Sequence, residues 1–233
     1  MSMLKNRIGW QILIIIGIFF GALLVYGQFF NKSLKKENTI EKFTSDNISS
    51  ELEIKGKKNA KLKIIVLSSY DCGWSRKYFN ETIKPFIDQE INKYDVSLRY
   101  DLVSFQNSVS LLGTEAAYCA NDQGKFWEAN EILWKLGEEN IEVNFKKENI
   151  LTGLANIGLN KQEFNNCLDN HKYLNVILEK GQWYLGKYDK LGFPTTFFND
   201  KQMQMLIQGT MQSVGAVSLE DFIKNINKEL NTK

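Results

Sequence analysis

The stretch at residues 67–75, Leu-Ser-Ser-Tyr-Asp-Cys-Gly-Trp-Ser, most constrains what this chain can fold into. Before it, residues 61–67 form a short β-branched run bounded by polar residues, which is typical of a buried strand. After it, apolar residues recur at helical spacing from Arg76 to Ile91, across a Pro85 that should kink the helix without ending it. We therefore expect a strand that leads directly into a helix, with Cys72 at the junction.

The position of Cys72 predicts its chemistry. At a helix start, unpaired backbone N–H groups and the positive end of the helix dipole favour an anion, which stabilises a thiolate. Ser75, three residues later, can reach back toward the sulfur with its hydroxyl. The pattern thus indicates a nucleophilic cysteine. The alternative is a small buried cysteine at the end of a strand, which is common for an isolated Cys.

A second stretch, Leu-Gly-Phe-Pro-Thr-Thr-Phe-Phe at residues 191–198, is followed by another apolar strand pattern at residues 205–207. Together the two stretches resemble the thioredoxin fold. In that superfamily a Cys-x-x-Cys motif opens the first helix, and a cis-proline before a later strand lies against it and exposes backbone for a substrate peptide. The resemblance places Pro194 at the cis-proline position, where Phe193, Pro194 and Thr195 would hold the peptide.

Two segments between these motifs, residues 114–128 and 158–169, resemble the helical insertion of the DsbA-like branch of thiol–disulfide oxidoreductases. The resemblance runs from about residue 51 to the C-terminus. It implies an α/β thioredoxin fold with a helical insertion at about residues 108–189. It also implies an enzyme that acts on thiols or disulfides of other proteins and needs no cofactor.

The motif departs from its relatives, because it reads Cys72-Gly-Trp74-Ser75 and the family's second active-site cysteine falls at Ser75. A neighbouring thiol normally resolves the mixed disulfide that the first cysteine forms, and serine cannot do so. We therefore expect isomerisation or reduction, in which a thiol of the substrate, of a redox partner or of a small molecule releases the product. Trp74 could pack against a docking peptide or cap the sulfur. The alternative function is a redox-inactive peptide-binding or chaperone-like module.

Residues 8–31 carry no charge and are long enough to cross a hydrocarbon core, which needs about 20 apolar residues. We interpret residues 1–7 as a tail, 8–31 as an uncleaved transmembrane anchor, and the polar residues 32–50 as a tether. A cleaved signal peptide is the alternative, but its apolar core is shorter and no A-x-A-like site is found. The flanking Lys and Arg residues do not favour a cytoplasmic N-terminus. This charge rule, however, has little influence on the orientation of long translocated domains. The family resemblance favours a single-pass membrane protein whose domain, residues 51–233, lies outside the cytoplasm.

Composition and the remaining polar residues limit other functions. A net charge of +2 with no basic stripe argues against nucleic-acid binding. His171, the single histidine, has no Cys, Asp or Glu at metal-ligand spacing, so no metal site is predicted. Three cysteines in an extracytoplasmic protein suggest one pair and one free thiol. Cys119 and Cys167 either form that pair or pack as two buried thiols, and Cys72 stays free.

The hydrophobic pattern also predicts the order of elements. Strands are expected at residues 51–55, 61–67 and 96–103, and two more after Pro194, for a sheet of about five. Helices are expected at residues 109–123, 126–136, 146–157, 161–169, 173–188 and 219–230, the last with Ser218 as its N-cap.

Overall fold

The computed structural model describes residues 52–188, 191–199, 201–202, 204–207, 210–213 and 215–231. The predicted anchor at residues 8–31 and the tether at residues 32–50 lie outside these ranges. Within the described ranges, none of the helices is both long and apolar enough to cross a membrane. The described residues belong to one compact unit, Ser45–Lys233.

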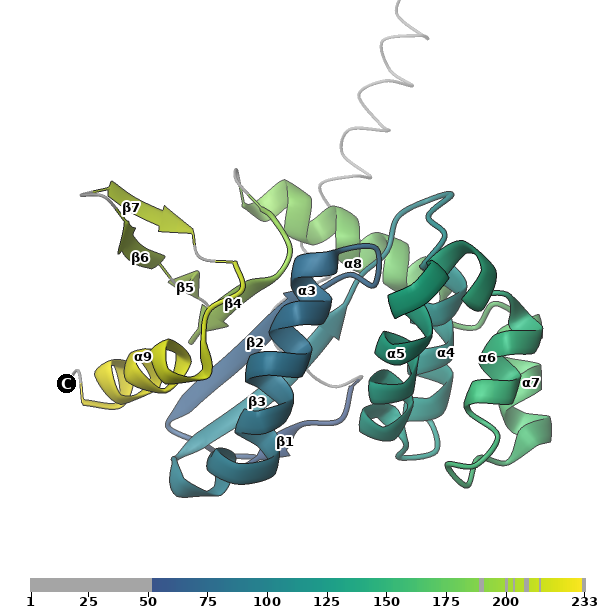
Figure 1. Ribbon diagram of the computed structural model, residues 1–233, viewed down its shortest axis with the longest axis horizontal. Helices are drawn as coiled ribbons and strands as arrows, with labels where there is room; N and C mark the ends of the chain where they lie inside the picture. The colour runs from purple at the N-terminus through teal and green to yellow at the C-terminus, as the bar shows by residue number, and fades with distance from the viewer. Residues whose placement is uncertain are drawn as a thin grey trace, which may run out of the picture. The chain divides into compact units, whose positions relative to one another are not determined.

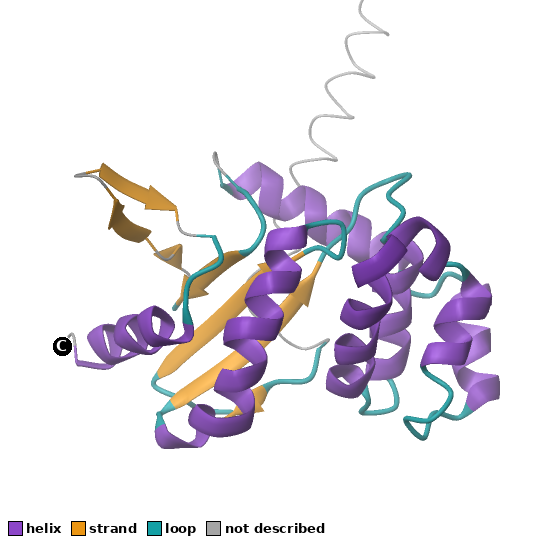
Figure 2. Cartoon of the chain, in the orientation of Figure 1, coloured by secondary structure: helices purple, strands orange, loops and turns teal. Residues whose placement is uncertain are grey.

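A five-stranded mixed sheet forms the centre of this unit (Figures 1 and 2). Its strand order is β1 (Lys55–Gly56), β3 (Val96–Leu102), β2 (Leu62–Ser68), β4 (Thr195–Phe198) and β5 (Lys201–Gln202). Strands β2 and β3 are parallel, and the other neighbours are antiparallel. The strands predicted at residues 61–67 and 96–103 are confirmed within about one residue.

Two strand predictions are confirmed only in part, because β1 overlaps the predicted residues 51–55 only at Lys55 and the strand at residues 205–207 forms outside the central sheet. Residues 52–54 do not join the sheet, because the N–H of Glu53 donates to the side chain of Asn121 at 2.8 Å and its carbonyl accepts from the Trp127 indole at 3.2 Å. The apolar pattern at residues 205–207 belongs to β6 (Gln204–Ile207), which pairs with β7 (Thr210–Ser213) in a separate hairpin. Phe198, followed by Asn199 at φ 46°, pairs with Lys201, so β5 takes the place next to β4.

The helix that follows β2 is continuous past Pro85, as predicted. It consists of α3 (Gly73–Tyr78), the π-helical segments η1 (Phe79–Ile83) and η2 (Phe86–Glu90), and the 3-10 turn η3 (Ile91–Lys93). Pro85 lies between the two π-helical segments, where wider turns accommodate a residue that has no N–H to donate. The helix lies along β2 and β3 in Figure 1.

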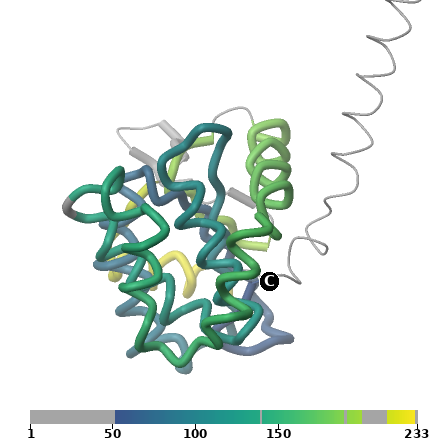
Figure 3. Tube along the Cα trace, turned by 90° about the vertical axis from the view of Figure 1, so that its right-hand side faces the viewer, coloured from purple at the N-terminus to yellow at the C-terminus, as the bar shows by residue number. Residues whose placement is uncertain are grey.

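Five helices fill the chain between β3 and β4 and confirm the helical insertion. They are α4 (Leu111–Asn121), α5 (Phe126–Asn144), α6 (Lys147–Gly153), α7 (Lys161–Asp169) and α8 (Leu174–Lys187). Helix α5 extends beyond the predicted end and contains a non-helical residue, Asn140. Figure 3 views the molecule from the side of this insertion, whose teal and green helices stand in front of the strands.

Helices cover both faces of the sheet. On β4, Phe198 stacks with Phe222 of α9 (Leu219–Asn231) at 6.2 Å, whereas Phe197 stacks with Tyr184 of α8 at 5.8 Å on the other face. The N-cap predicted for α9 is confirmed, since Ser218 Oγ accepts the Asp221 N–H at 3.1 Å. Because both faces are covered, all seven residues of β3 are buried, its polar members included.

Candidate active site

Cys72 lies at the carboxyl end of β2, where the chain turns into α3. Its N–H donates to Ser69 O at 3.0 Å, and its carbonyl accepts the Arg76 N–H at 3.1 Å. The residue is the N-cap of α3, with extended backbone angles (φ −101°, ψ 112°). Its thiol is half-buried, and it is the free cysteine of the described residues. The strand-to-helix junction predicted from the sequence is therefore present.

The loop before β4 lies directly against this sulfur. Cys72 Sγ donates to the carbonyl oxygen of Phe193 at 3.1 Å, and the Phe193–Pro194 peptide bond is cis. The antiparallel pairing of β2 with β4 sets Leu67 opposite Thr195 and so brings this loop to the end of β2. The structure thus brings Cys72 next to Phe193 and Pro194, although more than a hundred residues of sequence lie between the cysteine and this pair.

Ser75 differs from expectation, because its hydroxyl makes no hydrogen bond to the Cys72 sulfur. The side chain is fully buried, and within the described residues Ser75 Oγ has no hydrogen-bond partner. Ser75 stands one turn before Phe79, whose ring packs on Tyr100 at 5.5 Å, so both residues face the sheet. Ser75 is buried because it lies on the face of α3 that packs against the sheet.

Buried polar atoms also occur on β2, β3 and α5. Ser68 Oγ and Trp134 Nε1 lie near Tyr100 Oη, but, like Ser75 Oγ, none of these atoms makes a hydrogen bond of ordinary geometry in the described part of the chain. Burial raises the pKa of Tyr100 well above its usual value; the nearby Ser68 and Trp134 oppose that shift. The Tyr100 hydroxyl is therefore neutral at physiological pH. Groups of this kind normally bind one another or an ordered water.

The other predicted site residues divide into exposed and buried side chains. Trp74 is 64% exposed, and Lys77 Nζ lies 5.6 Å from its ring centroid. Phe193 is half-buried, whereas Pro194 is buried. Thr195 is 2% exposed, and its hydroxyl donates to Gly192 O at 2.7 Å. Trp74 and Phe193 therefore present side chains that a docking peptide can contact.

Sequence reasoning missed apolar residues in the loop after β3 and on α8, of which Phe105 packs near Phe193. The Phe105 ring lies 6.1 Å from the Phe193 ring, centroid to centroid. A Cβ on Gly181 of α8 would come within 3.2 Å of the Phe105 ring, so this glycine lets the loop after β3 approach α8. Val109 in the same loop is 45% exposed, and Leu185 of α8 is 44% exposed. No periodicity in the sequence marks these residues.

Asp71 is a second site feature that the sequence did not reveal. Its Oδ2 accepts hydrogen bonds from Ser110 Oγ at 2.6 Å, from Ser69 Oγ at 3.5 Å and from Ser108 Oγ. The residue next to Cys72 is therefore bonded to the loop that carries Phe105 and Val109.

Comparison with known proteins shows the family to which the domain with Cys72 and cis-Pro194 belongs. Residues 51–216 match the thioredoxin family. The chain belongs to the thioredoxin family. No curated protein sequence matches it.

Several solved structures share the thioredoxin fold with its helical insertion. Oxidised BdbD from Bacillus subtilis is 18% identical with a TM-score of 0.63 and covers 77% of this chain and 93% of its own. The thiol-disulfide exchange protein α-DsbA2 from Wolbachia pipientis is 17% identical (TM-score 0.55; 85% and 97% covered). MdbA, a thiol-disulfide oxidoreductase from Actinomyces oris, is 12% identical (TM-score 0.58; 78% and 92% covered). Two of these three structural neighbours, α-DsbA2 and MdbA, are thus named for thiol–disulfide exchange.

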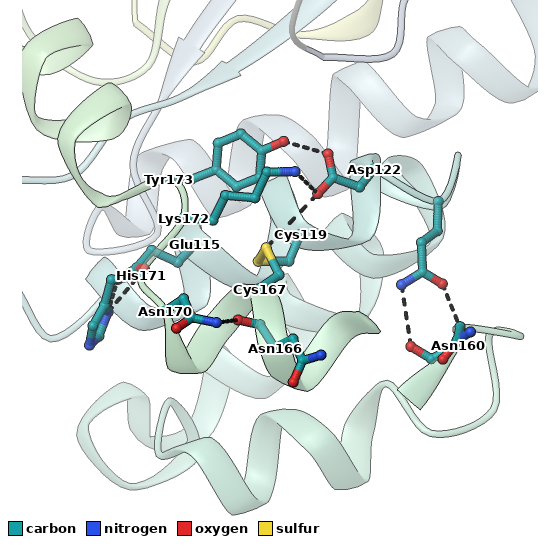
Figure 4. Close-up of a disulfide and its surroundings, with 11 residues drawn as sticks. Glu115, Cys119, Asp122, Asn160, Asn166, Cys167, Asn170, His171, Lys172 and Tyr173 are labelled. Atoms are coloured by element: carbon teal, nitrogen blue, oxygen red, sulfur yellow. Dashed lines mark hydrogen bonds and ion pairs between the residues drawn. A yellow bond between two sulfur atoms is a disulfide. The ribbon is translucent and has the colours of Figure 1, made fainter. Parts of the chain in front are cut away.

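The insertion of this thioredoxin domain contains a disulfide between Cys119 of α4 and Cys167 of α7, with the Cα atoms 5.8 Å apart (Figure 4). The sequence had left open whether these two residues are paired. Close to it, Asp122 accepts hydrogen bonds from Lys172 at 2.7 Å and from Tyr173. The exposed His171 contacts the buried carboxylate of Glu115 at 3.1 Å. Burial raises the pKa of Glu115, while His171 opposes the shift.

A buried charged network joins β3 of the thioredoxin sheet to α8. Asp101 accepts a hydrogen bond from the Tyr184 hydroxyl at 2.8 Å, and its Oδ1 lies 3.0 Å from Arg99 Nε and 3.7 Å from Lys180 Nζ. Burial alone would raise the pKa of Asp101, but Arg99 and Lys180 outweigh it, and the pKa lies below its ordinary value. The carboxylate is therefore charged at neutral pH.

Proposed function

We propose that this chain is a membrane-anchored, extracytoplasmic oxidoreductase that exchanges thiols and disulfides of other proteins through the single cysteine Cys72. The observation that carries the proposal is the position of the free Cys72 thiol. It stands at the start of α3, 3.1 Å from the carbonyl oxygen of Phe193 and beside the exposed Trp74. A half-buried thiol beside an exposed aromatic side chain suits attack on a disulfide in a bound polypeptide.

The proposed cycle uses a single thiol of this chain, that of Cys72. The Cys72 thiolate attacks one sulfur of a substrate disulfide, so a mixed disulfide forms and the other substrate sulfur leaves as a thiolate. A second thiol of the substrate, or a small-molecule thiol, then attacks the substrate sulfur and expels Cys72 as thiolate. In the first case the substrate is isomerised without net oxidation. In the second case the substrate sulfur is left bonded to the small-molecule thiol, and a second such thiol attacks that thiol's sulfur, so the substrate is released fully reduced and the two external thiols leave as their own disulfide.

A peptide-binding module without redox activity is the second candidate. The observation in its favour is Ser75, which stands where a resolving thiol would be and whose side chain is buried. In that case the exposed Trp74, Val109 and Leu185 would hold a polypeptide, and Cys72 would form no covalent bond with it.

Trapping mixed disulfides separates the two functions. We expect the full-length protein, quenched with acid and an alkylating agent in its own cells, to carry disulfide-linked partners that a reductant releases. Cys72→Ala should abolish these adducts, whereas Trp74→Ala should only reduce them, because it removes surface and keeps the thiol. If wild type and Cys72→Ala show the same adducts, Cys72 exchanges no disulfides and the binding module is correct.

Washing membranes with alkaline carbonate tests the proposed anchor. We expect the full-length protein to stay in the pellet with its N-terminal segment intact, because residues 8–31 contain no charge. A variant with two Asp residues introduced into that run should leave the pellet. Recovery of a soluble product that begins near residue 28 would instead show that the segment is a cleaved signal.

A further inference from the structure

The cluster formed by Asp71, Ser69, Ser108 and Ser110, here called the Asp71 cluster, has no part in the exchange cycle described above. Asp71 directly precedes Cys72, yet its carboxylate turns to the loop at residues 103–110, between β3 and α4. Both Ser108 and Ser110 of that loop donate to the same oxygen, Asp71 Oδ2. Three hydroxyls on one oxygen, from two separate loops, form a specific connection next to the nucleophile.

The serine hydroxyls of this loop form a chain of hydrogen bonds whose final acceptor is Asp71. Ser104 and Ser110 are fully buried, and their hydroxyls lie 3.0 Å apart. Because the single proton of Ser110 Oγ goes to Asp71, Ser110 accepts from Ser104. An ionised carboxylate has no proton and can only accept, so it fits a position that two or three hydroxyls approach as donors.

The connected loop carries two apolar side chains, one exposed and one packed near Phe193. Val109 stands between the two serines and is 45% exposed. Phe105, at the other end of the loop, packs between Gly181 of α8 and Phe193. Asp71 thus joins the residue that performs the attack to the loop that presents Val109 and Phe105.

We propose that Asp71 is a positioning residue, which holds the loop at residues 103–110 beside Cys72 so that this loop receives an apolar segment of the substrate. This inference rests on the proposed function and names its substrate class. The preferred disulfide belongs to an extended polypeptide with an apolar residue close to its cysteine. A small disulfide that cannot reach Val109 gains nothing from the loop.

Two disulfides of different size test the proposal on the full-length protein. The probes are glutathione disulfide and a peptide disulfide with Leu and Phe next to its cysteine. The measured quantity is the second-order rate of mixed-disulfide formation at Cys72. Displacement of a contact by about 1 Å can cost up to about 100-fold in rate. We expect Asp71→Ala to lower the peptide rate by about 10-fold or more, and the glutathione disulfide rate by less than about twofold.

Two further variants separate position from charge. The double variant Ser108→Ala/Ser110→Ala leaves the Asp71 charge in place and removes both hydrogen bonds from the loop to Asp71, so it should reproduce the selective loss. Asp95→Ala removes an exposed carboxylate that pairs with Lys57 at 3.4 Å, and it should change neither rate. Equal losses for both probes, or no loss for either, would overturn the proposal.

The proposed function and this inference can fail separately. If the wild type forms no adduct with either probe, the exchange function is wrong. Hydrogen exchange of residues 103–110 then decides the role of Asp71, since Asp71→Ala and Ser108→Ala/Ser110→Ala should both increase the exchange of this loop. Unchanged protection in both variants would show that Asp71 does not position it. If Asp71→Ala does not fold, the double serine variant is used for both the rate measurement and the hydrogen-exchange measurement.

Discussion

Replacement Ser75→Cys should convert the monothiol centre into one that forms an internal disulfide and resolves its own adducts. The introduced sulfur stands three residues after Cys72 on the first turn of α3, the spacing at which Cys-x-x-Cys thiols exchange. A thiol held on the same chain acts at a high effective concentration, which can exceed that of an external thiol by several orders of magnitude. We expect the lifetime of mixed disulfides at Cys72 to fall by about 100-fold or more, and net oxidation of a reduced protein to rise.

The measurement is a non-reducing gel of acid-quenched samples, together with the rate at which the pre-oxidised variant introduces disulfides into a reduced model protein. Ser75→Ala is the matched control, because it removes the same hydroxyl and supplies no thiol; its adducts should live as long as those of the wild type. The new side chain also replaces a buried hydroxyl without a partner in the described residues, so folding should not suffer. Long-lived adducts in Ser75→Cys would show that the introduced thiol cannot reach the mixed disulfide.

The sequence predicts the centre of this fold well, because local patterns determine it. The β-branched run at residues 61–67 and the helical spacing from Arg76 onward specify β2 and α3 and place Cys72 at their junction. Five helices of the insertion are predicted for the same reason, since each has its own apolar period. The position of Pro194 beside Cys72 came from the family resemblance, and the structure has that arrangement.

The remaining features depend on contacts that no local pattern records. The direction of Ser75 follows from the burial of the face that it shares with Phe79. Residues 52–54 look like a strand, but the insertion binds the backbone of Glu53. Asp71 and Ser110 are 39 residues apart, and each alone is an ordinary loop residue. Polar residues in β3 suggest an exposed face, yet the α8 side chains bind them in the interior.

That buried face leads to the prediction with the largest expected effect on stability. Asp101→Asn keeps the shape of the side chain and removes the one negative charge that, among the residues the structure describes, pairs with Arg99 and Lys180. Both cations then stay buried without compensation, 5% and 0% exposed. Removal of one partner from a buried ion pair costs about 3–5 kcal/mol. We expect a loss of that size in the free energy of unfolding, measured by urea denaturation and tryptophan fluorescence at pH 7.

The pH dependence of that loss follows from the lowered pKa of Asp101. A carboxylate with a folded-state pKa below its unfolded value of about 3.9 contributes stability above that value. The contribution is lost as the pH falls through the lower, folded-state pKa. The difference between wild type and Asp101→Asn should therefore be full at neutral pH and shrink as the pH drops below about 4.

Two controls test whether the loss of unfolding free energy in Asp101→Asn comes from the two uncompensated buried cations. Asp88→Asn breaks an exposed pair with Lys84 at 2.7 Å and should cost at most about 1 kcal/mol. The double variant Asp101→Asn with Lys180→Met removes one uncompensated cation and fills its space with an apolar chain, so it should recover part of the loss. If Asp101→Asn costs no more than Asp88→Asn, or the double variant is less stable than the additive sum, Asp101 does not stabilise this interface by neutralising the two cations.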